Sequence, residues 1–191
     1  MAFEARPLDI ADVILVTAPR IEDSRGYFME TYRLSDFAAL GMAAAFVQDN
    51  QSMSAQRGTI RGLHYQRPPR AQAKLVRVLK GAIFDVVVDL RRGSNSYGRW
   101  TGATLTAKGG EQLFMPRGFA HGYCTLEPDT EVAYRSDDYY SPGDEGGIHF
   151  ADPAIGIDWP VSAGEAVLSD KDRSLPFLGD LATPFISECP S

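Results

Sequence analysis

Short apolar runs recur along this chain, and Gly, Pro, Asn or Asp separates each run from the next. Many short strands at this spacing are typical of an all-β sandwich or barrel. Two glycine turns, Lys80-Gly81 and Gly109-Gly110, each lie between two apolar runs and predict tight hairpins between antiparallel strands. The runs predict strands near residues 11–17, 27–33, 45–49, 58–65, 73–80, 82–90, 99–106, 111–115, 120–126 and 130–136.

One segment favours a short helix. Ser35 is the expected N-cap, Asp36 lies in the first turn, and Phe37 and Leu40 share one apolar face. Gly41 follows, and glycine is the residue that most often ends a helix. We expect this helix to be only a turn or two long.

The length of 191 residues indicates a single domain over residues 1–191. We expect a barrel core over about residues 45–140, with N-terminal strands over residues 1–44 packed on it. Beyond about Asp152, five prolines interrupt regular structure, so residues 141–191 should wrap around the barrel as loops. The expected fold is an antiparallel β-barrel or jelly roll with one or two short helices.

Composition and charge exclude several classes of partner. Hydrophobic residues make up 44% and charged residues 23%, which suits a folded core rather than a disordered chain. The net charge of −6 argues against a general nucleic-acid or anionic-membrane surface. The most apolar stretch, residues 82–90, contains Asp85 and Asp89 and is far shorter than the ~20 residues of a spanning helix. We therefore expect neither nucleic acid nor a membrane as a partner.

The N-terminus and the cysteines indicate the compartment. The first residues lack the basic start and long apolar run of a signal peptide. Cys124 and Cys189 form no spaced motif, so we expect reduced thiols rather than a disulfide or a zinc site. Both observations favour a cytoplasmic protein.

Residues 110–125, GEQLFMPRGFAHGYCT, resemble the second motif of the cupin barrels, except that Thr125 replaces an Asn. Pro116 and Gly118 turn the chain between two strands, and His121 then points into the mouth of the cupin-like barrel. For His121 taken alone, a turn followed by a core histidine bonded to a neighbour is the favoured interpretation.

The first cupin motif should supply two histidines and a glutamate, and its position here is residues 58–66, GTIRGLHYQ. Only His64 is present, Gln66 occupies the second histidine position, and no acidic residue follows before Asp85. A three-His or two-His-one-carboxylate metal site cannot be assembled from these positions. His149 lies in a loop-rich region and is expected to be a surface or packing residue. We therefore expect neither a metal nor another cofactor.

The remaining polar residues form a set suited to acid/base chemistry. His64 can remove a proton at neutral pH, Lys74 and Arg61 can stabilise negative charge on a carbonyl oxygen, and Tyr134 can donate a proton. Strict strand alternation would place Arg61 and His64 on opposite faces. Both can face one cavity only if Gly62 forms a bulge or kink.

The chain resembles the dTDP-4-dehydrorhamnose 3,5-epimerase family. The resemblance implies a homodimeric β-barrel without a metal, acting on a 4-keto-6-deoxyhexose linked to dTDP. RGLHYQ followed by KLV and GFAHG is its most specific combination. The matching stretches are DSRGYFMETY (23–32), VQDNQSMS (47–54), residues 61–91, MPRGFAHGY (115–123), VAYRSDDYYSP (132–142), DEGGIHFADP (144–153) and LSDKD (168–172).

By position, the resemblance implies that His64 is the base, Tyr134 the acid and Asp172 the carboxylate that orients the base, with Asp170 as a rival for that last role. Lys74 would polarise the C4 keto oxygen, helped by Arg61. Tyr140 would stack on the thymine. The other expected substrate contacts are Arg25, Glu30, Gln48, Asn50, His121, Glu145 and Lys171.

Two alternatives stay open at the level of sequence. A related enzyme that inverts only C3 or only C5, or a ketoisomerase of deoxysugar synthesis, would share these motifs. A barrel that binds the nucleotide sugar without catalysis is the other alternative. Taken singly, Glu145, Tyr140 and Lys171 also suit a solvated loop.

Overall fold

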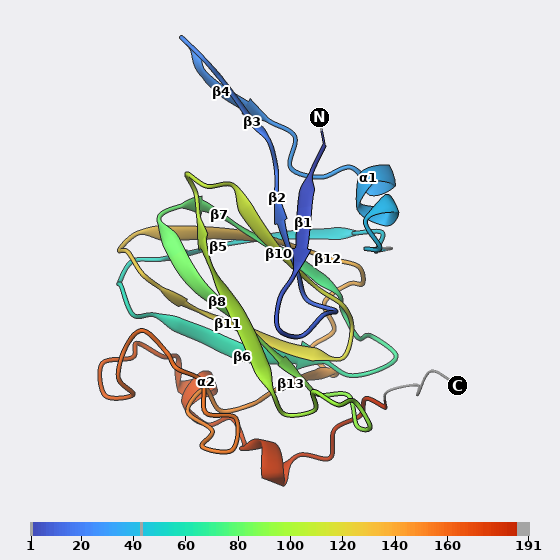
Figure 1. Ribbon diagram of the computed structural model, residues 1–191. Coiled ribbons are helices and arrows are strands. Elements are labelled where there is room, and N and C mark those ends of the chain that lie inside the picture. Colours follow the sequence, from blue (N-terminus) through green and yellow to red (C-terminus); the bar gives the residue numbers. More distant parts are fainter. Residues whose placement is uncertain (1, 43, 187–191) are drawn as a thin grey trace.

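Two antiparallel sheets and a projecting hairpin make up the computed structural model, which describes residues 2–42 and 44–186 (Figure 1). The six-stranded sheet has the order β1 (Glu4–Pro7), β2 (Ile14–Thr17), β10 (Glu111–Met115), β7 (Lys74–Lys80), β12 (Thr130–Ser136) and β5 (Gln48–Ser54). The five-stranded sheet has the order β13 (Glu145–Gly147), β6 (Ile60–Gln66), β11 (Phe119–Thr125), β8 (Ala82–Asp89) and β9 (Trp100–Thr106).

The remaining elements lie outside these sheets. Strands β3 (Arg20–Asp23) and β4 (Gly26–Met29) form a hairpin that extends away from the barrel in Figure 1. The helices are α1 (Leu34–Ala39), α2 (Asp170–Arg173) and a 3₁₀ turn over Leu178–Asp180. The predicted all-β architecture of antiparallel strands with short helices is confirmed.

The main core lies between the two sheets. Leu113 and Val76 from the six-stranded sheet pack with Val87 and Phe119 from the five-stranded sheet, and all four are almost fully buried. Alternate residues of β8 face the other way and pack under the C-terminal segment, which covers the outer face of this sheet. Burial on both faces explains why β8 is the most apolar stretch of the chain.

Both predicted hairpin turns are wrong. Lys80-Gly81 joins β7 of one sheet to β8 of the other, and Gly109-Gly110 likewise joins β9 to β10. Gly81 has φ +79°, and a Cβ there would lie 2.5 Å from Thr130 Oγ1. The glycine turns were recognised correctly as chain reversals, but they carry the chain between sheets.

Several predicted boundaries also differ. Residues 27–33 are not one strand, because β4 ends at Met29 and pairs with β3, which was not predicted. The strand predicted at residues 45–49 instead begins at Gln48, as β5, and continues through polar residues to Ser54. The short strands β1 and β13 were not predicted. Ser35 is not the N-cap, since the helix starts at Leu34 after Arg33, whose side chain makes no capping bond. Gly41 does follow the helix end, with φ +86°.

Two further observations concern compartment and membrane. No helix within residues 2–42 and 44–186 is long and apolar enough to cross a bilayer. Cys124 is a buried free thiol, and Cys189 lies outside the described residues.

Candidate active site

Two adjoining cavities open between the sheets and share His64, Lys74 and Tyr134 in their walls. The larger one, about 470 Å³, is here called the acid/base compartment, and the smaller one, about 300 Å³, the loop compartment. The acid/base compartment is lined among others by Ser52, Arg61, His121, Tyr123, Ser169, Lys171 and Asp172. The loop compartment is lined among others by Gln48, Asn50, Gln66, Gln72, Tyr140 and Glu145.

A histidine–carboxylate pair forms one wall of the acid/base compartment. His64 Nε2 lies 2.7 Å from Asp172 Oδ1, which belongs to α2 in the C-terminal segment. Asp172 is itself held because its backbone N–H donates to the Ser169 hydroxyl at 3.1 Å. Burial acts to raise the pKa of Asp172, but the bond and charge of His64 hold that pKa below its usual value. Asp170 is exposed at the start of α2, so the carboxylate against His64 is Asp172.

A bulge in β6 brings Arg61 to the same compartment as His64. His64 pairs with His121 and Arg61 pairs with Tyr123, so two residues of β6 oppose one residue of β11. Gly62 occupies the bulge with φ +121°, and a Cβ there would lie 2.6 Å from Gly122 Cα. The irregularity that the sequence required at Gly62 is therefore present.

Lys74 and Tyr134 come from the opposite wall, in the six-stranded sheet. Burial lowers the pKa of Lys74 to about 8, while the charges of Asp85 and Glu145 act to raise it. Lys74 Nζ lies 5.9 Å from the centre of the Tyr134 ring. Burial raises the pKa of Tyr134 above that of a free phenol, with Arg61 acting in the other direction. At neutral pH the Tyr134 hydroxyl is thus a proton donor that faces the compartment from across His64.

His121 has a carboxylate partner that sequence reasoning missed. Its Nε2 lies 2.5 Å from Oδ1 of Asp85, a fully buried residue of β8. His121 stands directly opposite His64 in the strand pairing. The sequence did contain a signal for this pair: Asp85 is an acidic residue at a core-facing position of a strongly apolar strand, and a buried carboxylate needs a partner.

Five of the expected substrate contacts lie in the walls of the two compartments: Gln48, Asn50, Tyr140, Glu145 and Lys171. Glu145 Oε1 lies 2.6 Å from Lys171 Nζ, and the Tyr140 hydroxyl donates to Glu145 Oε2 at 3.0 Å. Gln48 Oε1 accepts a bond from the Tyr140 backbone N–H at 2.9 Å. The Nδ2 group of Asn50, which lines the same compartment, is buried without a hydrogen-bond partner among the described residues.

Arg25 and Glu30 are not brought into either compartment. Arg25 lies in the turn of the β3–β4 hairpin, where its exposed guanidinium pairs with Asp23. Glu30 follows β4 and pairs with Arg33 at 2.6 Å. Within one copy of the chain, these two residues lie apart from the other expected contacts.

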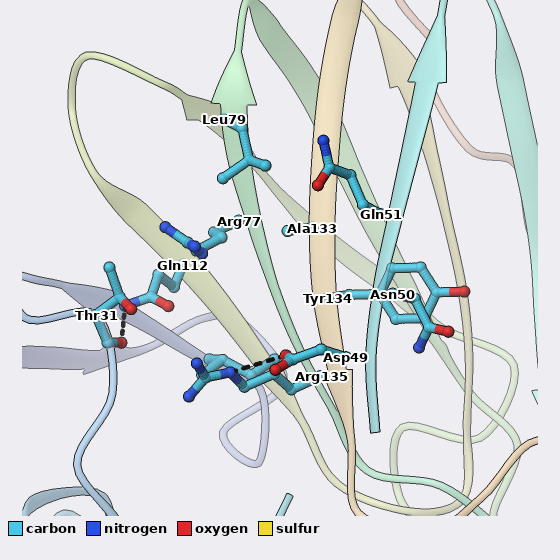
Figure 2. A pocket seen from close by; sticks show the side chains of 11 residues that line it. Thr31, Asp49, Asn50, Gln51, Arg77, Leu79, Gln112, Ala133, Tyr134 and Arg135 are labelled. Atoms are coloured by element: carbon cyan, nitrogen blue, oxygen red, sulfur yellow. Dashed lines mark hydrogen bonds and ion pairs between the residues drawn. The ribbon is translucent and has the colours of Figure 1, made fainter. Parts of the chain in front are cut away.

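Another cavity lies on the outer face of the six-stranded sheet. Figure 2 shows Arg77 and Gln112 on one side of β12, and Tyr134 and Asn50 on the other. Arg135 pairs there with Asp49 at 3.0 Å. Tyr134 belongs to the walls of both this outer cavity and the acid/base compartment, but His64 and Asp172 do not line the outer cavity.

Gln66, at the second histidine position of the cupin motif, has its amide fully engaged. Its Oε1 accepts from the Ser141 N–H at 2.7 Å, and its Nε2 donates to the Arg70 and Tyr139 carbonyls at 2.6 and 3.2 Å. Among the residues that the structure describes, no three His, Cys, Asp or Glu side chains form a group that could hold a metal ion.

Comparisons with known proteins find consistent similarity over most of the chain. The model of the dTDP-4-dehydrorhamnose 3,5-epimerase family matches residues 7–180. A protein of that name from Sinorhizobium fredii is 48% identical, over 93% of this chain and 91% of the relative. A dTDP-4-dehydrorhamnose 3-epimerase from Streptomyces niveus is 39% identical, over 92% of this chain and 84% of the relative.

A solved structure shows the same architecture with a ligand. The dTDP-6-deoxy-D-glucose-3,5-epimerase of Legionella pneumophila, in complex with dTDP-4-keto-L-rhamnose, superposes with a TM-score of 0.92. It is 38% identical in sequence, and the match covers 97% of this chain and 99% of that chain.

Proposed function

The chain belongs to the dTDP-4-dehydrorhamnose 3,5-epimerase family, and from that membership we propose that it inverts C3 and C5 of dTDP-4-dehydro-6-deoxy-D-glucose. The product is dTDP-4-dehydro-L-rhamnose, and the enzyme is an isomerase. The observation that carries the proposal is the His64–Asp172 pair facing Tyr134 across a cavity that also contains Lys74.

The chemistry needs only proton transfers. The C4 keto group acidifies the protons at C3 and C5, and His64 removes one of them as the C–H electron pair moves into an enolate. The negative charge develops on the C4 oxygen, where Lys74 and Arg61 stabilise it. Tyr134 then donates a proton to the carbon from the opposite face, which inverts the centre. Proton exchange with water returns His64 to its neutral form and Tyr134 to its protonated form before the second inversion.

Asp172 is proposed to orient the base rather than to transfer a proton. Its bond to Nε2 fixes the ring of His64 and favours the imidazolium that forms when the substrate proton is taken. No metal or redox cofactor has a part in these steps.

The loop compartment is proposed to bind the dTDP group. Tyr140 supplies an exposed aromatic ring, Gln48 and Asn50 supply amides, and Lys171 supplies a positive charge beside Glu145. Asn50 Nδ2 supports this role, because the buried donor lacks a partner within residues 2–42 and 44–186. His121, in the acid/base compartment, is expected to contact the sugar.

A homodimer is proposed in which each hairpin reaches the site of the partner. The hairpin leaves three apolar side chains exposed, those of Ile21, Tyr27 and Phe28 at 49%, 55% and 63%. Burying them against a second copy would remove apolar surface from water and bring Arg25 and Glu30 to a site. A cytoplasmic location is proposed as well, supported by the buried free thiol of Cys124.

The test follows solvent deuterium into the sugar by NMR, with purified chain and a dTDP-linked 4-keto-6-deoxyglucose in deuterated water. Wild-type protein should incorporate deuterium at C3 and C5 and invert both, and exhaustive treatment with EDTA should not change this. His64→Asn should bind substrate but exchange neither position, and Asp172→Asn should be impaired less.

The outcomes separate the alternatives. Exchange and inversion at C3 alone would establish a 3-epimerase, the activity for which the Streptomyces niveus relative is named. Binding without any exchange would establish a non-catalytic binding module. Loss of activity in EDTA that zinc, iron or manganese restores would overturn the metal-free mechanism.

A further inference from the structure

The segment that carries Tyr140 presents two exposed tyrosines, but its backbone is held by hydrogen bonds. It runs from Asp138 to Ser141 after the end of β12, and the side chains of Tyr139 and Tyr140 are 60% and 53% exposed. Surface loops with exposed aromatic residues usually move more than the strands beside them. Here the backbone is held at four consecutive residues.

Three glutamine side chains provide these bonds, and none of the three belongs to the segment. Gln72 Nε2 donates to the Asp138 carbonyl at 2.8 Å, and Gln48 Oε1 accepts from the Tyr140 N–H at 2.9 Å. Gln66 Nε2 donates to the Tyr139 carbonyl at 3.2 Å, and Gln66 Oε1 accepts from the Ser141 N–H at 2.7 Å. The Gln66 amide therefore spans the peptide units on both sides of Tyr140.

Gln66 is the central member of this set, which we call the glutamine clamp (Gln48, Gln66 and Gln72). It is 4% exposed and lies at the end of β6, whereas Gln48 and Gln72 are half-buried. A buried amide of this kind is costly unless its polar atoms are satisfied, and here they are satisfied by loop backbone. Gln66 lies two residues after His64 on β6. The same strand therefore connects the proposed base to the loop of Tyr140.

The Tyr140 ring is also restrained at its far end. Its hydroxyl donates to Glu145, which is paired with Lys171, so the ring has a bond beyond those of its backbone. Ordering a side chain or a loop on binding costs free energy, and a ring that is ordered beforehand avoids that cost.

We propose that the glutamine clamp positions the Tyr140 ring as a preformed stacking surface for the planar base of the nucleotide. Gln66, Gln72 and Gln48 act as positioning residues for affinity rather than for the proton transfers. This inference rests on the proposed function in one respect, because it takes the loop compartment to be the nucleotide site.

The experiment measures the Kd for dTDP by calorimetry, and KM and kcat for the ketosugar substrate. Gln66→Leu replaces the amide side chain with an apolar side chain of similar size. It should weaken dTDP binding and raise KM by about tenfold, which corresponds to ~1.4 kcal/mol, with kcat within about twofold of wild type. In a Tyr140→Ala background the same substitution should leave the Kd for dTDP unchanged, because the ring that it positions is gone.

A matched control separates positioning from loss of stability. Thr183→Val removes another buried bond from a side chain to backbone, that of Thr183 Oγ1 to the Leu90 carbonyl at 2.6 Å. It should lower the Tm without changing the Kd for dTDP. If Gln66→Leu does not fold, Gln72→Met tests the same clamp, since Gln72 makes one bond to the segment and is half-buried.

The clamp and the proposed function fail in different ways. If Gln66→Leu binds dTDP as well as Thr183→Val does, or if its effect adds fully to that of Tyr140→Ala, the clamp is wrong. If Tyr140→Ala itself binds dTDP as tightly as wild type, the nucleotide site is wrong. Epimerisation by wild-type protein tests the reaction independently of both.

Discussion

In the proposed reaction, Lys74 is charged when the substrate carbonyl becomes an enolate, and its surroundings act on that charge in both directions. Burial lowers the pKa of Lys74 to about 8, although Asp85 and Glu145 act to raise it. The Lys74 side chain is fully protonated well below this pKa and loses its positive charge as the pH rises through it. We therefore expect kcat/KM to fall above about pH 8, far below the ordinary lysine value of ~10.4.

The pH profile of kcat/KM between pH 6 and pH 10 checks this expectation. A profile that stays level to pH 10 would contradict the assignment of Lys74 to the oxyanion. Lys74→Met should lower kcat by about 10²- to 10³-fold at pH 7, as removal of one oxyanion donor does elsewhere.

Tyr134 is expected to affect inversion without affecting proton removal. Tyr134→Phe keeps His64, Asp172 and Lys74, so the base can still remove a proton and return it to the same face. We expect deuterium exchange at C3 and C5 to continue while inversion slows by about 10²-fold or more. NMR of exchange alongside the rate of sugar inversion measures both. Inversion at the wild-type rate would remove Tyr134 from the mechanism and make Tyr140 the next candidate acid.

The sequence identified single residues best where their chemistry and motif position agreed. His64, Lys74, Tyr134 and Asp172 were all expected at the site, and the structure brings them to one compartment. Asp85 was missed because its charge was considered only as an interruption of an apolar run. Its role depends on His121, 36 residues away on a neighbouring strand, which no local pattern reveals.

Among the elements, β6 depends on the backbone conformation of Gly62. A Cβ at Gly62 would meet the Gly122 backbone, and φ +121° is unfavourable for any other residue. Gly62→Ala should therefore lower the free energy of unfolding by about 1–3 kcal/mol. It should also reduce kcat/KM, since Arg61 and His64 share a compartment only through this bulge.

Urea unfolding and steady-state kinetics measure these two effects. Gly164→Ala is the matched control, because a Cβ there meets no atom within 4 Å. Equal stability and activity in the two variants would show that β6 accommodates a side chain at Gly62.

At the scale of elements, the sequence predicted strands well and their partners poorly. Most apolar runs are strands, because alternation and burial act within a few residues. The two glycine turns were assigned to hairpins, yet they connect different sheets. A turn sequence specifies a reversal of the chain, whereas the choice of sheet depends on contacts between distant strands. β5 was misplaced because its residues, QDNQSMS, are polar and face cavities on both sides of the sheet.

At the scale of the whole molecule, the projecting β3–β4 hairpin predicts that each copy in a dimer contributes residues to the site of the other copy. Arg25→Glu and His64→Asn should each have low activity, for different reasons. In a mixed dimer, one site would combine an intact His64 with an intact hairpin from the other copy. Unfolding the two variants together and refolding them at equal amounts should therefore restore about a quarter of wild-type activity, given random pairing. Refolding each variant alone is the control. If mixing restores nothing, the hairpin does not complete the partner's site.

The bond between His64 and Asp172 joins residues that are 108 positions apart, and Asp172 lies on a short helix of the C-terminal segment. A ribosome makes His64 early and Asp172 late, after every strand of both sheets has been translated. A nascent chain that has reached residue 160 already holds the strands for Lys74, Tyr134 and His121, but Asp172, the hydrogen-bond partner of His64, has not yet been made. The His64–Asp172 bond can therefore form only after the segment that carries α2 has been translated, and a pause in translation before residue 169 would delay activity without delaying synthesis of the barrel strands.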